Sequence, residues 1–215
     1  MMELLQNVGF VGQGIVLTIA LLSGGIIIGM LFGTAFAILR YKGIATTIIH
    51  RFISVTRGTP LILQLSFIYF AIPGLLGIKP DILTAGIFTF GLNSSAYIAE
   101  ILRAGIESIP KGQFEAAKTL EIPTYYLWKD IILPQVFKNI LPALINEMIA
   151  LLKETALIST IGGMDLMRKA QSIAAEQFTY FLPLCIAGAY YYCLVLCIEC
   201  VGKKVEQRGQ YVTSH

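Results

Sequence analysis

The chain has 215 residues, of which 56% are hydrophobic and 13% charged, with a formal net charge of +3 and a mean hydropathy of +0.73. Soluble domains carry about 25% charged residues, so this chain has too few to cover a water-facing surface. The composition therefore excludes a soluble globular protein and predicts an all-α integral membrane protein.

Five apolar regions follow one another along the chain, and each is long enough for, or close to, the roughly 20 residues that a helix needs to cross the hydrocarbon core. Four of them contain no Asp, Glu, Lys or Arg: residues 4–39, 58–78, 82–99 and 177–198. The remaining region, 139–164, is interrupted by Glu147, Lys153 and Glu154. The sequence predicts five transmembrane helices in a single membrane domain that covers residues 1–215.

The first span contains Gly25, Gly29 and Gly33, a small residue at every fourth position. This spacing allows another helix to approach closely in lipid. It is compatible with dimerisation or with packing inside one subunit, and we favour the second. The second span begins at Pro60, which suits the first turn of a helix because its missing N–H has no partner there.

Basic residues gather in the segments after the first and third spans and in the C-terminal tail. These segments hold 12 of the 16 basic residues: Arg40, Lys42, Arg51, Arg57, Arg103, Lys111, Lys118, Lys129, Lys138, Lys203, Lys204 and Arg208. Because Lys and Arg are enriched in cytoplasmic loops, we expect the N-terminus outside and the C-terminus in the cytoplasm. The opposite, outer segment 163–178 predicts a short amphipathic helix.

The charged stretch 110–123, PKGQFEAAKTLEIP, predicts a short helix on the cytoplasmic side. Phe114, Ala117 and Leu120 or Glu121 recur at three- and four-residue steps, which gives the helix one apolar face. Such a face needs a cover, either the headgroup layer or a groove on a soluble partner. Glu115 and Glu121 argue against an anionic membrane surface, so we favour a protein partner.

The same stretch resembles the EAA loop of the membrane-spanning subunits of bacterial ABC importers. Its Glu-Ala-Ala triplet stands at 115–117 and its Ile-x-Leu-Pro at 131–134, while Glu121 replaces the glycine of the motif. That glycine is useful at a helix end because it tolerates positive φ. Three further segments, RGTPLILQLSFIYFAIP, AYIAEILRAGIESIPKGQFEAA and LLKETALISTIG, are similar to the polar amino acid permease subfamily, which includes histidine, arginine and glutamine uptake systems.

The resemblance implies the type I ABC importer fold, with a cytoplasmic coupling helix between the third and fourth spans, inside the segment 110–135. It also implies a bacterial inner (cytoplasmic) membrane, a second permease subunit in a homodimer or heterodimer, a cytoplasmic ABC ATPase dimer and an extracytoplasmic amino-acid-binding protein. The residues expected to couple this chain to the ATPase are Phe114, Glu115, Ala116, Ala117, Leu120 and Glu121.

The sequence contains no G-x-x-x-x-G-K-[ST] phosphate-binding loop. ATP and Mg are therefore expected on the partner ATPase, with no cofactor, metal or catalytic residue in this chain, and the subunit is not expected to be an enzyme. The four cysteines all lie in the last span, and three of them have helical spacing: Cys193, Cys197 and Cys200. We interpret them as small apolar residues rather than metal ligands.

Charged side chains inside a span are candidates for contact with a solute, because they are costly at membrane depth without a partner. Glu154 is the leading candidate, and an ion pair with Lys153 is the structural alternative. Adjacent residues of a helix point about 100° apart, which makes that pair awkward. Glu147 shares a face with Glu154 two turns away and is expected to line the same path.

On the third span Asn93, Tyr97 and Glu100 form one polar stripe, with Ser94 beside it. These groups fit either the α-amino and carboxylate groups of an amino acid or hydrogen bonds between helices. For Glu100 a structural ion pair with Arg103, one turn away, is favoured. The candidate substrate-binding residues are Glu154, Asn93, Ser94, Tyr97, Thr59 and Asp81.

These features favour a permease subunit of an ATP-driven importer of polar amino acids, working by alternating access. The acid at Glu154 favours arginine, lysine or histidine as the substrate. The alternative is a channel or ion-coupled carrier that works alone and uses Glu100, Glu147 and Glu154 as a relay. An intramembrane enzyme is disfavoured, because the only histidines are His50 and His215.

Overall fold

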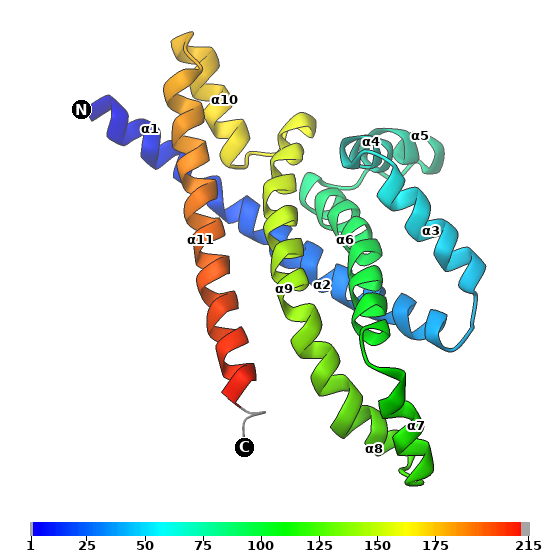
Figure 1. Cartoon of the computed structure of the whole chain (residues 1–215). Helices are drawn as coiled ribbons and strands as arrows, with labels where there is room; N and C mark the ends of the chain where they lie inside the picture. The colour runs from blue at the N-terminus through cyan, green and yellow to red at the C-terminus, as the bar shows by residue number, and fades with distance from the viewer. Residues whose placement is uncertain (1, 212–215) are drawn as a thin grey trace.

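The structure, a computed structural model, describes residues 2–211 (Figure 1). Over this range the chain forms helices joined by short turns, and no strand is present. The predicted all-helical class is confirmed for the described residues. His215 and the last residues of the predicted tail lie outside them.

The first predicted span is made of two helices, α1 (Met2–Gly12) and α2 (Ile15–Tyr41). Gly14, at the break between them, lies against the backbone of Asp165, and a Cβ atom at this position would overlap with that backbone. The chain needs glycine here because the start of another helix passes within contact distance.

The helix that starts there is α10 (Leu166–Gln177), the predicted amphipathic segment, and this prediction is confirmed. One oxygen of the buried Asp165 side chain accepts the backbone N–H of Arg168 at 2.9 Å and caps the helix. The other oxygen accepts the Tyr191 hydroxyl at 3.0 Å, which ties α10 to α11 (Phe181–Tyr211). Burial raises the pKa of the Asp165 carboxyl above its usual range.

The centre of the fold is the contact between α2 and α6 (Ile82–Glu107). Gly25, Gly29 and Gly33 are all buried in it. A Cβ atom at Gly29 would lie 2.9 Å from the side chain of Ser94, and one at Gly33 would lie 2.9 Å from the carbonyl oxygen of Ser95. The predicted close packing within one subunit is confirmed.

The next predicted elements differ from the structure. The segment taken as a loop after the first span contains α3 (Thr46–Gly58), and the predicted second span is α4 (Leu61–Ser66), the π-helical turn η1 (Phe67–Ala71) and α5 (Ile72–Leu76). α3 and the segment after it meet at 105°. The bend falls at Thr59, which is extended because the ring of Pro60 disfavours helical backbone in the preceding residue.

The remaining helices form the segment predicted to be cytoplasmic and the fourth predicted span. In chain order they are α7 (Lys111–Thr119), α8 (Thr124–Tyr126), the π-helical turn η2 (Leu127–Ile132), α9 (Leu133–Glu154) and the 3-10 turn η3 (Thr155–Ile161). α9 packs against α6 on one side and α11 on the other. Figure 1 shows α1 and α10 at one end of the molecule and α7 and α8 at the other.

Within the described residues, three helical segments are long and apolar enough to cross a membrane: Met2–Tyr41, Ile82–Glu107 and Phe181–Gln207. The bent pair of α3 with the segment Leu61–Leu75 makes up to four. α9, which contains Lys138, Glu147, Lys153 and Glu154, is not among them. The membrane-spanning character is confirmed, whereas the count of five spans stays a prediction.

Candidate functional site

The predicted polar stripe of α6 faces the bent pair of α3 and α4. The amide of Asn93 donates to the side-chain oxygen of Gln64 at 3.3 Å. The guanidinium of Arg57 lies 5.2 Å from the centre of the Tyr97 ring, and one of its nitrogens lies 3.8 Å from a Glu100 oxygen. The stripe therefore joins α6 to both arms of the bend.

Gln64 holds the bend itself. Its amide nitrogen donates to the Thr59 hydroxyl at 2.9 Å and to the carbonyl oxygens of Thr56 at 2.8 Å and Thr59 at 3.2 Å. The Thr59 hydroxyl in turn donates to the carbonyl of Val55 at 2.9 Å. Sequence reasoning missed Gln64, although it is the only Asn or Gln in the charge-free stretch 58–78, which was the available signal.

Ser94 points away from this stripe, toward α9. It is fully buried, and its hydroxyl donates to the carboxylate of Glu147 at 2.7 Å. Gly29 of α2 lies against the other side of Ser94. Three helices therefore fix the position of the Glu147 carboxylate, and Ser94 provides its hydrogen bond.

Glu154 is half-buried at the end of α9, on the same helix face as Glu147 two turns away. Among the described residues its carboxylate accepts no hydrogen bond, and it forms no salt bridge with Lys153, which points outward. Glu154 is thus an acid, in a helix predicted to cross the membrane, whose acceptor oxygens are open to a further ligand.

Asp81, predicted as a substrate contact, is used by its own helix. One of its oxygens accepts the backbone N–H of Thr84 at 3.0 Å and the other accepts the Thr84 hydroxyl at 2.6 Å. The Thr84 hydroxyl holds the pKa of the Asp81 carboxyl below its usual range. The Asp81 side chain is exposed at the start of α6. Capping this helix explains why an aspartate stands at this position.

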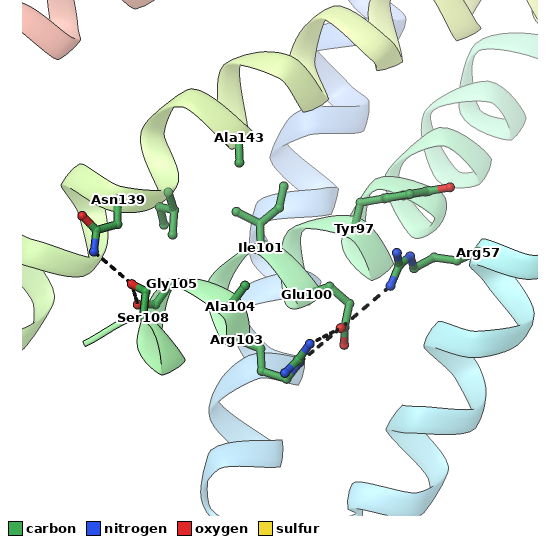
Figure 2. A pocket seen from close by; sticks show the side chains of 11 residues that line it. Arg57, Tyr97, Glu100, Ile101, Arg103, Ala104, Gly105, Ser108, Asn139 and Ala143 are labelled. Carbon is green, nitrogen blue, oxygen red and sulfur yellow. Dashed lines mark hydrogen bonds and ion pairs between the residues drawn. The ribbon is translucent and has the colours of Figure 1, made fainter. Parts of the chain in front are cut away.

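Glu100 is the centre of an ion-pair network at the other end of α6 (Figure 2). The predicted pair with Arg103 is present, with nitrogen–oxygen distances of 2.9 and 3.1 Å. Arg40 at the end of α2 and Arg57 of α3 also pair with Glu100. Arg103 reaches Glu107 as well, at 2.5 Å. The network joins three helices, and sequence reasoning missed the roles of Arg40 and Arg57.

A cavity of about 610 Å³ opens beside this network, between α3, α6 and α9. Figure 2 shows Tyr97 and Arg57 on one side of it and Asn139 on the other, where Asn139 donates to the Ser108 hydroxyl at 2.9 Å. The cavity is thus lined by both polar and apolar side chains, and it continues the Asn93–Tyr97 face of α6 toward the end that carries α7.

The predicted coupling segment forms a helix, α7, that packs against η2 and the start of α9. Gln113 and Gln135 exchange two amide hydrogen bonds, at 2.9 and 2.7 Å. The Phe114 ring meets the ring of Trp128 edge-on, with centres 6.2 Å apart, and Ala117 is buried. Phe114 and Ala117 therefore attach α7 to its own chain.

The opposite face of α7 is exposed, and no described part of the chain covers it. Of the predicted coupling residues, Glu115, Ala116, Leu120 and Glu121 are exposed, and Leu120 has 72% of its surface accessible. Leu120 directly follows α7 and presents an uncovered apolar side chain that a partner protein could bury. The geometry separates the six predicted residues into two that mount the helix and four that face outward.

Glu121 adopts positive φ, at 53°, in place of the glycine of the EAA motif. The N–H of Ile122 donates to the carbonyl of Ala117 at 2.9 Å, and the N–H of Glu121 donates to that of Lys118 at 3.2 Å. These two bonds are the Schellman motif that ends a helix in the left-handed conformation. The turn keeps the geometry of the motif despite the departure in sequence.

Replacing Glu121 with glycine is therefore expected to stabilise the end of α7 by about 1 kcal/mol, because a non-glycine residue pays that much for left-handed backbone. Hydrogen exchange of the α7 amides measures it, and about fivefold slower exchange is expected. Glu115→Gly, inside the same helix, is the control and is expected to speed exchange by a similar factor. Faster exchange in both variants would contradict the assigned turn.

Comparison with known proteins gives a family match over nearly the whole chain. The model described as "Binding-protein-dependent transport system inner membrane component" matches residues 6–210. A chain from Rickettsia conorii, provisionally named a glutamine transport system permease protein, is 46% identical over 201 residues, which cover 93% of this chain and 92% of the relative. The arginine transport system permease protein of Bacillus subtilis is 42% identical over 206 residues, which cover 95% and 94%.

Solved structures give the same result. A crystal structure of an amino acid ABC transporter with histidines superposes with a TM-score of 0.88 at 36% identity, over 96% of this chain and 97% of that one. An inward-facing methionine ABC transporter superposes with a TM-score of 0.72 at 17% identity, over 94% and 95%. The second likeness concerns the fold alone.

Proposed function

The chain belongs to the family of binding-protein-dependent transport system inner membrane components, and from this premise we propose that it is the permease subunit of an ATP-driven importer of polar amino acids. As a member of this family it is a transport component and not an enzyme. The relatives named for glutamine and arginine transport support an amino acid as the substrate.

The observation that carries the proposal is α7, a helix held firmly by Gln113 and Phe114 while Leu120 and its neighbours stay uncovered. Through these contacts a displacement of α7 would be passed on to α9. We propose that Phe114, Glu115, Ala116, Ala117, Leu120 and Glu121 form the coupling helix, seated on a separate ATPase dimer that binds ATP and Mg. In that arrangement α7 lies in the cytoplasm and α10 on the outer side, next to a solute-binding protein.

Leu120→Glu is expected to reduce the amount of ATPase that co-purifies with the chain by at least about tenfold, which corresponds to about 1.4 kcal/mol. The reason is that the substitution places an unpaired charge at a contact that becomes buried. Phe178→Glu is the matched control, because Phe178 is 94% exposed at the opposite end of the molecule. Equal ATPase recovery from both variants would remove α7 from the coupling interface.

For the substrate we propose a contact at Glu154, with Glu147 lining the same path. Glu147 already accepts the Ser94 hydroxyl, whereas Glu154 forms no hydrogen bond or salt bridge with a described side chain. A carboxylate with open acceptors favours a cationic group such as that of arginine, lysine or histidine. Asn93, Ser94, Tyr97, Thr59 and Asp81 stay candidate contacts. Four of them already form side-chain hydrogen bonds within the chain, and the ring of Tyr97 lies against Arg57.

The test is ATPase activity of the chain reconstituted with its ATPase and binding protein in proteoliposomes. Stimulation by arginine is expected to fall at least about tenfold in Glu154→Gln, because an uncompensated charged partner costs 2–5 kcal/mol at a buried contact. Stimulation by glutamine, a neutral substrate, is expected to stay within about twofold. Lys153→Gln is the control, since that side chain points outward from the neighbouring position.

Two other outcomes have distinct meanings. If glutamine and arginine lose stimulation equally, Glu154 acts on the structure and cationic preference is wrong, while the importer assignment stands. If the chain alone moves solute in vesicles without an ATPase, the independent carrier replaces the importer.

A further inference from the structure

An apolar groove of about 500 Å³ lies on a different face of α6 from the cavity beside Glu100. α6 presents Leu102 and Ile106 to the groove, whereas Glu100, Arg103 and Ala104 line the cavity. α2 and α9 form the two sides of the groove. The groove is therefore separated from the proposed solute path by the α6–α9 pair.

The groove is a recess with uncovered apolar edges. Ala37 and Ile140 are buried inside it, whereas Ile38 on α2 and Phe137 on α9 keep 50% and 60% of their surface accessible. Within the described residues nothing packs over these edges. An apolar recess of this kind at membrane depth is filled by a hydrocarbon chain, because water finds no hydrogen-bond partner there.

One end of the groove has the side chains of a membrane interface. The rings of Tyr41 and Trp128 meet edge-on at 5.0 Å, and Lys42 lies beside them. Tyr and Trp prefer the headgroup level of a bilayer, and a lysine there attracts anionic lipid. Lys42 is exposed and forms no salt bridge with an acid in the described part of the chain.

We propose that this groove binds an anionic phospholipid, with one acyl chain between α2 and α9 and the headgroup phosphate at Lys42. The site is at the end of the molecule that carries α7, so under the proposed orientation the lipid belongs to the cytoplasmic leaflet. The lipid would fill the space between α2 and the base of α9, next to the mount of α7, without touching the solute path.

Trp128 makes the proposal directly testable, because it is the only tryptophan of the chain and lines the groove. The full-length chain is reconstituted in phosphatidylcholine vesicles that contain a small fraction of brominated phosphatidylglycerol or, separately, brominated phosphatidylcholine. Bromine quenches tryptophan fluorescence only at short range. Quenching per brominated lipid is expected to be about fivefold stronger for phosphatidylglycerol, the preference that one lysine provides for an anionic headgroup.

Two pairs of variants locate the effect. Lys42→Gln is expected to abolish the headgroup preference, whereas Lys204→Gln, exposed on α11 and outside the groove, keeps it. Thr34→Phe fills the groove and is expected to reduce quenching by both lipids about twofold or more, whereas Ala35→Phe, exposed on the next position of α2, leaves it unchanged.

Equal quenching by the two brominated lipids in the unmodified chain would overturn the proposal, since the groove would then hold bulk lipid only. Weak quenching by both lipids, unchanged in Lys42→Gln, would also overturn it and would show that a second copy of the chain covers the groove. Neither result affects the assignment as an importer subunit, which the ATPase experiment tests separately.

Discussion

Gly33→Leu is expected to disrupt the contact between α2 and α6 and to lower the thermal unfolding midpoint of the chain by about 6 to 12 °C. A Cβ atom at this position would lie 2.9 Å from the Cβ of Ile98 and 2.9 Å from the carbonyl oxygen of Ser95. The neighbours include backbone, so the two helices have to move apart. Overpacking of this kind costs about 3 kcal/mol.

Ala35→Leu is the matched control, because Ala35 is exposed on the same helix two residues away. It is expected to shift the midpoint by less than about 2 °C, as surface substitutions usually do. Fluorescence-detected size-exclusion chromatography after heating measures both variants. A similar shift in the two variants would mean that the glycines of α2 do not pack against α6 in the membrane.

The packing of α2 was predictable because small residues four apart in a membrane helix have one main use, the close approach of a neighbour. The amphipathic segments that became α7 and α10 were also predictable, since a single apolar face shows in the sequence spacing. In both cases the information lies within about three turns of one helix. Tertiary contacts then stabilised the same helices that the local sequence already favoured.

The bend between α3 and α4 was not predictable in the same way. Arg51 and Arg57 make α3 resemble a loop, while the stretch after Pro60 has the hydropathy of a complete span. What fixes the 105° angle is Gln64, whose amide binds both Thr56 and Thr59 across the break. A side chain that holds two helices together has no periodic signal along the sequence.

The candidate site shows the same division between local and distant contacts. The Glu100–Arg103 pair, one helical turn apart, was predicted, whereas Arg40 reaches Glu100 across 60 positions of sequence and was missed. Ser94 was predicted to be functional, but its bond to Glu147 depends on how α6 and α9 are placed. The sequence identified polar residues that are costly in lipid, and only the fold shows which of them already have partners.

Glu100→Gln is expected to destabilise the chain by about 2 to 3 kcal/mol, or about 5 to 10 °C in the unfolding midpoint. Glu100 and Arg40 each keep only 20% of their side-chain surface accessible, so the pair is partly screened and the lower part of the range for buried pairs applies. The substitution leaves Arg40, Arg57 and Arg103 close together with no acid at their centre.

Arg103→Gln is the comparison that distinguishes a shared acid from three independent surface pairs. After that change Glu100 still has Arg40 and Arg57, so a cost of only about 1 kcal/mol is expected. The double variant is expected to cost less than the sum of the single ones by about 1 kcal/mol, because removing Arg103 also relieves repulsion among the arginines. Equal costs for the two single variants with full additivity would mean that α2, α3 and α6 are held together by packing alone. The predicted asymmetry instead makes one carboxylate the group that joins these three helices, at the edge of the cavity on the proposed solute path.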